Sequence, residues 1–171
     1  MLLLAALLQT AACPATPAPP PPELAGWTGK APIAASAWGE RTVPLKRPLK
    51  GRLLPATLPL GQGATASVLP SATLRLAVSP GKPPTAGTYG GMLSLVVPAP
   101  GRYRIALGAA AWLDLVRDGK ALTSVAHAHG PACTGIRKMV DFDLRSGRYL
   151  LQIAGSPTPA IDVMVAQLPG D

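Results

Sequence analysis

A chain of 171 residues has room for one modest hydrophobic core. Aromatic residues make up only 4% of it, whereas it holds 18 glycines and 21 prolines, a composition that argues against a helical bundle. The formal net charge is +8, and no acidic residue occurs between Arg41 and Trp112. The positive charge therefore belongs mainly to the first part of the chain.

The densest basic stretch has two interpretations. It comprises Arg41, Lys46, Arg47, Lys50 and Arg52. These side chains could contact an anionic envelope surface, such as lipopolysaccharide or phospholipid head groups, or they could form a solvated linker that keeps an apolar protein soluble. Two prolines interrupt any helix here and no aromatic residue lies among the charges, so we do not expect nucleic-acid binding.

The N-terminal residues 1–12, MLLLAALLQTAA, are uncharged and apolar and end in small residues. This pattern is typical of the apolar region and cleavage site of a secretory signal peptide, although the basic region that normally precedes them is missing. The run is too short to span a bilayer. We therefore expect a periplasmic or secreted protein without a transmembrane span.

The two cysteines, Cys13 and Cys133, allow two outcomes. In an oxidising compartment they could form a disulfide. Alternatively, the TAAC sequence at 10–13 is an imperfect lipobox, in which case Cys13 would be lipidated and would anchor an outer-membrane lipoprotein. Both outcomes require export.

The composition changes near residue 60. Residues 13–60 form a Pro-rich basic leader or linker that we expect to be extended, and the sequence leaves open whether it docks onto the rest. Residues 61–168 carry strand-length segments separated by turn residues. The first predicted strands are 66–69 and 73–78, followed by a loop over 79–91.

Regular alternation begins near residue 92. Segment 92–97 is almost continuously apolar, and 102–107 places alternate apolar side chains on one face. Segments 112–117 and 120–126 flank Asp118 and Gly119, a pair that favours a type I′ hairpin turn.

Three later segments each have one apolar face, and these faces predict one core. The residues are Ile136, Lys138, Val140, Phe142 and Leu144, then Tyr149, Leu151 and Ile153, then Ile161, Val163 and Val165. Because such faces must be buried against one another, we predict an all-β fold, a small antiparallel β-sandwich or jelly-roll.

The tripeptide Gly-Arg-Tyr occurs at 101–103 and again at 147–149, each time at the start of an alternating strand. A tyrosine in this position commonly buries its ring and donates a hydrogen bond to nearby backbone at a sandwich corner. We therefore interpret Tyr103 and Tyr149 as architectural.

Residues 90–166 resemble the bacterial pre-peptidase C-terminal domain, a secreted β-sandwich module. The resemblance rests on LVVPAPGRYRI at 95–105, on the strand of Asp114 with its hairpin, and on FDLRSGRY at 142–149. It implies an accessory domain without catalysis of its own, in a class of which some members bind carbohydrate or calcium.

Two further runs, WLDLVRDGK at 112–120 and HAHGPACTGIRK at 127–138, are similar to a family of small exported proteins from Gram-negative bacteria. Members of that family often carry the name homogentisate 1,2-dioxygenase. The authentic dioxygenase uses two histidines and a carboxylate to bind iron, with a glutamate shortly after the histidine pair. Here Cys133 follows the pair and no glutamate occurs after Glu40.

His127 and His129 are the only histidines, and side chains two apart on a strand point the same way. With Asp114 or Asp141 they could ligate iron or copper. The same segment also reads as an ordinary loop fixed by a disulfide.

Trp112 beside Asp114 could bind a ligand, since an exposed tryptophan is a natural platform for a sugar ring. We therefore expect a non-catalytic exported β-sandwich module, without a cofactor, that binds an envelope component or polysaccharide. The alternative is a metal-dependent oxidoreductase that uses the histidine pair.

Overall fold

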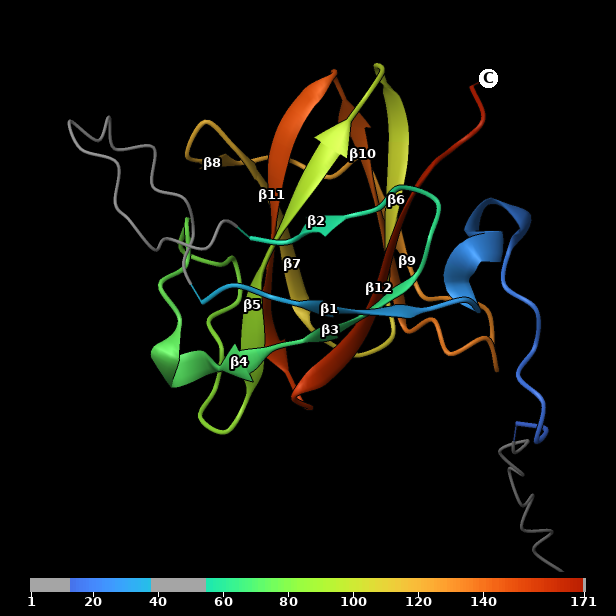
Figure 1. The fold of residues 1–171 in the computed structure, drawn as a ribbon, viewed down its shortest axis with the longest axis horizontal. Coiled ribbons are helices and arrows are strands. Elements are labelled where there is room, and N and C mark those ends of the chain that lie inside the picture. Colours follow the sequence, from blue (N-terminus) through green and yellow to red (C-terminus); the bar gives the residue numbers. More distant parts are fainter. Residues whose placement is uncertain (1–12, 38–54, 171) are drawn as a thin grey trace, which may run out of the picture.

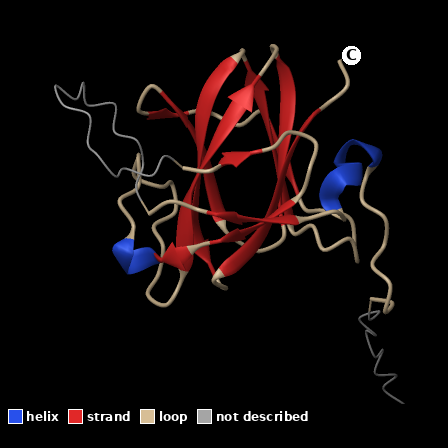
Figure 2. Ribbon diagram, in the orientation of Figure 1, coloured by secondary structure: helices blue, strands red, loops and turns tan. Residues whose placement is uncertain are grey.

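The computed structural model describes residues 13–37 and 55–170, and within them two β-sheets pack face to face as a sandwich (Figure 1). Strands dominate, and the helical segments are two short 3-10 turns (Figure 2). The predicted all-β sandwich is therefore confirmed. No helix in the described ranges is long and apolar enough to cross a membrane. The predicted signal segment 1–12 and the basic stretch 41–52 lie outside the described residues.

Each sheet mixes antiparallel and parallel pairs. The first sheet contains, in spatial order, β1 (Ala31–Ala34), β3 (Ala64–Ser67), β12 (Ala160–Gln167), β6 (Gly101–Leu107), β10 (Lys138–Leu144) and β9 (Ala126–Ala128). The second contains β2 (Thr57–Leu58), β5 (Tyr89–Val97), β11 (Gly147–Ser156), β7 (Trp112–Arg117) and β8 (Lys120–Ala121), with β4 (Leu69–Pro70) paired to β5. The short helices are η1 (Pro22–Trp27) and η2 (Ser71–Thr73).

The sandwich, predicted as antiparallel, also contains two parallel strand pairs. β1 pairs with β3 and β2 pairs with β5 in parallel. Both β1 and β2 belong to the segment predicted as a leader, and they reach the sheets through long connections rather than hairpins, which is how parallel neighbours must be joined.

The main core lies between the sheets and follows the predicted alternation. Tyr103, Ile105 and Leu107 of β6 are fully buried there. The predicted apolar faces of β10, β11 and β12 join them, with one difference. Ile136 precedes β10 and packs in a second cluster, because the strand begins only at Lys138.

This second cluster covers the outer face of the first sheet. Leu24 and Trp27 of η1 are buried in it against Met164 of β12 and Met139 of β10. The Trp27 Nε1–H donates a hydrogen bond of 3.1 Å to the backbone oxygen of Thr134. The described part of the leader is therefore docked on the sandwich (Figure 1).

The docked helix also changes the environment of Asp141. Its alternation with apolar neighbours predicts the solvent face of a strand, but the side chain is buried under η1. Arg104 of β6 donates to both carboxylate oxygens of Asp141 at 2.8 Å and to Glu23 of η1 at 2.6 Å. These hydrogen bonds raise the pKa of Arg104.

The predicted strand 73–78 is wrong. The backbone of Ala77 and Val78 bonds instead to the buried side chain of Gln152, whose Oε1 accepts from Ala77 N–H at 2.8 Å. The Nε2 of Gln152 donates to the carbonyl of Val78 at 3.1 Å. A glutamine side chain thus replaces the neighbouring strand that this segment would need.

The hairpin after β7 is confirmed, but its second arm is shorter than predicted. Asp118 and Gly119 have φ angles of 52° and 73°, as a type I′ turn requires. Only β8 pairs back onto β7, and the chain then crosses to β9 at the edge of the first sheet.

Both tyrosines make the predicted corner. The hydroxyl of Tyr103 donates to the carbonyl of Ala99 at 2.8 Å, and that of Tyr149 donates to the carbonyl of Arg145 at 2.7 Å. Each partner lies four residues upstream, so the two Gly-Arg-Tyr segments build the same motif.

Cys13 and Cys133 form the predicted disulfide, with a Cα–Cα distance of 5.4 Å. Next to it, the N–H of Ala18 donates to the carbonyl of Cys133 at 2.8 Å. The bridge ties the start of the described chain to the loop between β9 and β10, beside the buried Trp27.

Candidate functional site

A pocket of about 690 Å³ opens at one end of the sandwich, and we call it the end pocket. Its walls come from the loop at 82–85, the start of β7 at 110–112, the edge strand β9 at 127–129, the start of β10 at 137–138 and the end of β11 at 154–155. Both sheets and one loop contribute, so the pocket exists only in the folded sandwich.

The structure places His127 and His129 together on a wall of this pocket. His127 pairs with Val140, whose side chain lies in the core between the sheets. Paired residues point to the same side of a sheet, so His127 faces the inner side of the first sheet at its edge. His129 follows the end of β9, and both histidines are exposed and line the pocket.

The carboxylates predicted to complete a metal site are elsewhere. Within residues 13–37 and 55–170, no three His, Cys, Asp or Glu side chains are close enough to hold one metal ion. Asp141 is bonded to Arg104. The guanidinium of Arg137 lies 3.4 Å from Nδ1 of His129, a position that disfavours a cation at that nitrogen. Among the described residues, the two histidines therefore have no third protein ligand for a metal ion.

Asp114 is a buried structural group rather than part of the pocket lining. One carboxylate oxygen accepts from Trp112 Nε1–H at 2.9 Å, and the other accepts from Gln152 Nε2–H at 3.1 Å. Because Gln152 also binds the backbone of Ala77 and Val78, Asp114 fixes both the tryptophan ring and the loop that closes the pocket.

Trp112, which the sequence offers as a platform for a sugar ring, lines the pocket, but its ring is in contact with protein groups. The ammonium of Lys138 lies 5.2 Å from the ring centroid, a cation–π contact, and donates to the carbonyl of Ala111 at 3.3 Å. The backbone of Gly81 packs closely against the six-membered ring of Trp112. A Cβ atom added to Gly81 would lie only 2.6 Å from the nearest carbon of that ring. Trp112 therefore holds a lysine at the pocket wall instead of presenting an open stacking face.

The described lining of the end pocket is positively charged. Lys82, Arg137 and Lys138 contribute cations, and no Asp or Glu is among the lining residues. Burial lowers the pKa of Lys138, the charge of Asp114 raises it, and the charge of Lys82 lowers it further. None of these three cations is a predicted site residue. The one sequence signal for them is the pair Arg137-Lys138, which ends the run HAHGPACTGIRK that begins at His127.

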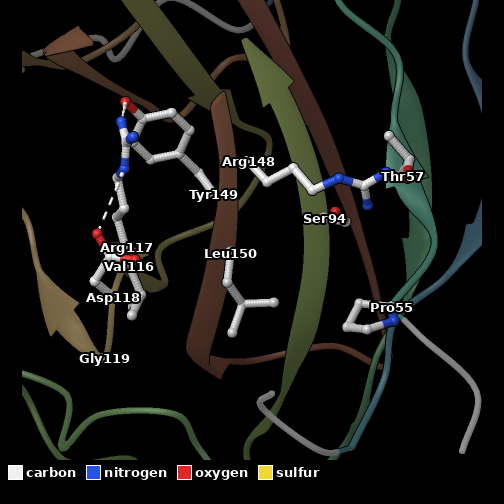
Figure 3. A pocket seen from close by; sticks show the side chains of 10 residues that line it. All are labelled: Pro55, Thr57, Ser94, Val116, Arg117, Asp118, Gly119, Arg148, Tyr149 and Leu150. Carbon is white, nitrogen blue, oxygen red and sulfur yellow. Dashed lines mark hydrogen bonds and ion pairs between the residues drawn. The ribbon is translucent and has the colours of Figure 1, made fainter. Parts of the chain in front are cut away.

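A smaller pocket of about 240 Å³ lies on the outer face of the second sheet (Figure 3). Arg148 extends across Ser94 toward Thr57 there. On its other side the guanidinium of Arg117 donates to Tyr149 Oη at 2.8 Å and lies 3.7 Å from a carboxylate oxygen of Asp118 (Figure 3). This pocket is smaller than the end pocket, and one of its two arginines is engaged by Tyr149 and Asp118, so the end pocket is the better candidate.

The fold and the site define the class of the molecule as an all-β sandwich with a cationic pocket at one end. Comparison with protein-family models gives no match, and a search of curated proteins gives no significant match either. The function must therefore be argued from the site.

Proposed function

We propose that the protein is an exported, non-catalytic β-sandwich module that binds an envelope polysaccharide in the end pocket. The observation that supports this most is the composition of the pocket. An apolar wall of prolines, alanines and Trp112 surrounds a few convergent hydrogen-bond donors from Lys82, Arg137 and Lys138. Ligand sites in proteins typically combine an apolar surface with a few such polar groups.

The position of the pocket suits a polymer. It lies at an open edge of the sandwich, bounded by β9 and by the loop at 82–85, so a chain could enter and leave without being enclosed. A module of this kind acts by recognition, which requires positioned donors but no nucleophile or acid–base pair.

The disulfide supports export, because such bonds persist in oxidising compartments such as the periplasm and the extracellular space. A lipid anchor at Cys13 would use the same sulfur atom that the disulfide uses. The intact mass of protein purified from its host distinguishes the two: loss of two hydrogens indicates the disulfide, and the added mass of acyl chains indicates the lipoprotein.

Binding of the full chain to a panel of immobilised envelope polysaccharides tests the proposal. Ala110 is exposed on the wall of the end pocket, so Ala110→Trp should fill the pocket and weaken binding by about tenfold or more. Ala121→Trp, on exposed β8 and outside the pocket lining, is the matched control and should bind normally. Absence of binding to every polymer, or equal loss in both variants, would contradict the proposal.

The alternative function is a metal-dependent oxidoreductase that uses His127 and His129. A single observation favours it, the placement of both imidazoles on one pocket wall. Titration of the protein with ferrous iron and with cupric ion decides it: saturable 1:1 binding that disappears in the His127→Ala, His129→Ala double variant would support a metal site and weaken the polysaccharide proposal.

A further inference from the structure

The carboxylates of the described residues are all engaged outside the end pocket. The ion pairs join Asp162 to Lys30, Asp143 to Arg102, Asp118 to Arg117 and Asp141 to Arg104, and Arg104 also binds Glu23. The remaining acid, Asp114, accepts from Trp112 and Gln152. Among the residues that the structure describes, no carboxylate therefore forms an ion pair with Lys82, Arg137 or Lys138.

These three cations gather on one pocket although they come from distant parts of the chain. Lys82 belongs to the loop before β5, whereas Arg137 and Lys138 open β10 in the other sheet. Lys138 points to the inner side of the first sheet, because its partner Leu107 packs in the main core. Lys138 is partly desolvated there, and the charge of Lys82 also lowers its pKa. The fold therefore holds two like charges near each other.

Trp112 strengthens this argument because it fixes the position of Lys138. The indole is immobilised by its hydrogen bond to Asp114 and by the close packing of Gly81. The ammonium group lies over the indole ring and is bonded to the carbonyl of Ala111. A cation that is held in place loses less side-chain entropy when it binds an anion.

From this geometry we propose that the ligand of the end pocket is an acidic polysaccharide, whose carboxylates pair with Lys82, Arg137 and Lys138. The inference rests on the proposed function and names the ligand class. The ligand carboxylates pair with cations that form no ion pair with a described carboxylate, although the buried charge of Asp114 acts on Lys138 from outside the lining. The apolar parts of the sugar rings lie against the proline and alanine wall. A neutral glycan would leave the three cations unpaired.

The test compares polygalacturonate with amylose of matched length, by isothermal titration calorimetry with the full chain. We expect polygalacturonate to bind and amylose to bind at least about tenfold more weakly, with an affinity for polygalacturonate that falls as salt is added. Ala110→Glu places a carboxylate on the pocket wall, and Ala110→Gln places a neutral group of the same shape there. The glutamate variant should lose about tenfold or more in affinity relative to the glutamine variant.

A second pair of variants separates the pocket from overall charge. Arg137→Gln removes a lining cation, whereas Arg145→Gln removes an exposed cation outside the pocket lining, so the net charge changes equally. Only the first substitution should weaken polygalacturonate binding.

The outcomes are distinguishable. If amylose binds as tightly as polygalacturonate and the charge variants have no effect, the proposed function stands and the acidic class is wrong. If neither polymer nor any other envelope polysaccharide binds, both proposals fail. If vesicles containing phosphatidylglycerol bind in a manner that depends on Arg137 while polygalacturonate does not, the partner is a membrane and the polysaccharide inference is overturned.

Discussion

Asp141 and Asp143 offer a sharp test of how the leader docks on the sandwich. Both lie on β10, both pair with an arginine of β6, and they differ in burial: the side chain of Asp141 is 7% exposed and that of Asp143 is 58% exposed. Replacement of each by asparagine keeps its size and removes its charge. We expect Asp141→Asn to destabilise the protein much more than Asp143→Asn.

The magnitudes follow from the environment of each pair. Removal of one partner from a fully buried ion pair costs about 3–5 kcal/mol because the other charge is left unpaired. Arg104 is partly exposed and keeps its contact with Glu23, so we expect the lower value of about 2–3 kcal/mol for Asp141→Asn. The Asp143–Arg102 pair lies at the surface, where solvent screens it, so Asp143→Asn should have little effect on stability.

Urea unfolding at neutral pH, followed by tryptophan fluorescence with the disulfide intact, measures both variants. Trp27 is buried beside this ion network, so loss of the helix contact should also be visible in the folded baseline. A third variant, Glu23→Gln, tests the contact between η1 and Arg104, and it should cost less than Asp141→Asn. The amide oxygen of glutamine can still accept the one bond from Arg104, whereas asparagine can keep only one of the two bonds that Asp141 accepts. A difference below about 1 kcal/mol between the two aspartate variants would refute the argument from burial.

Three further predictions use other parts of the fold. The double variant Cys13→Ser, Cys133→Ser opens a loop with a sequence separation of 120, which the chain-entropy model values at about 4–5 kcal/mol, and denaturant unfolding should show a loss of that order. Tyr103→Phe removes one hydrogen bond and should cost about 1 kcal/mol, whereas Tyr149→Phe also leaves Arg117 and the N–H of Arg145 without their acceptor and should cost about twice as much in the same assay. Because burial lowers the pKa of Lys138, affinity for polygalacturonate should decline with rising pH earlier than an ordinary lysine would allow, and calorimetry across alkaline pH should show this step vanish in Lys138→Gln.

The sequence predicted those elements whose signals are local. Alternation identified the buried faces of β6, β11 and β12, because one face of each packs in a common core. The turn at Asp118 and Gly119 and the two tyrosine corners follow from backbone requirements within a few residues. The pairing of the two cysteines was one of two open outcomes, since the sequence alone could not say whether they approach each other.

Where the sequence analysis failed, the cause is a partner distant in the chain. Asp141 is a polar residue in an alternating strand, and no neighbouring residue in the sequence indicates that Glu23 and η1 cover it. Residues 73–78 alternate like a strand, but the side chain of Gln152 takes their backbone groups. Neighbouring residues in the sequence do not indicate either contact, because burial by a segment distant in the chain does not follow the alternation of a strand.

The candidate site was predicted only in part, again because some of its residues come from distant parts of the chain. His127 and His129 lie on one pocket wall, whereas Asp114 accepts from Trp112 and Gln152 outside the lining. The position of Asp114 relative to the histidines could not be predicted, because it depends on how the two sheets stack. Lys82 reaches the pocket through a loop whose place is set by its backbone bonds to Gln152. Sites assembled from several loops and strand ends are visible only once the fold is known.

The net charge of +8 does not by itself identify a binding site, because several cations of the described residues serve the fold. Arg104 and Lys30 fix the leader segment against the first sheet through carboxylates on β10 and β12. Among the described residues, ion pairs outside the end pocket use all the acids except Asp114, which accepts from Trp112 and Gln152 and acts on Lys138 only through its charge. The cations that line the end pocket therefore form no ion pair with a described carboxylate. The same allocation of charge that holds the leader in place therefore leaves one end of the sandwich positive, and that is why an acidic ligand is the expected occupant.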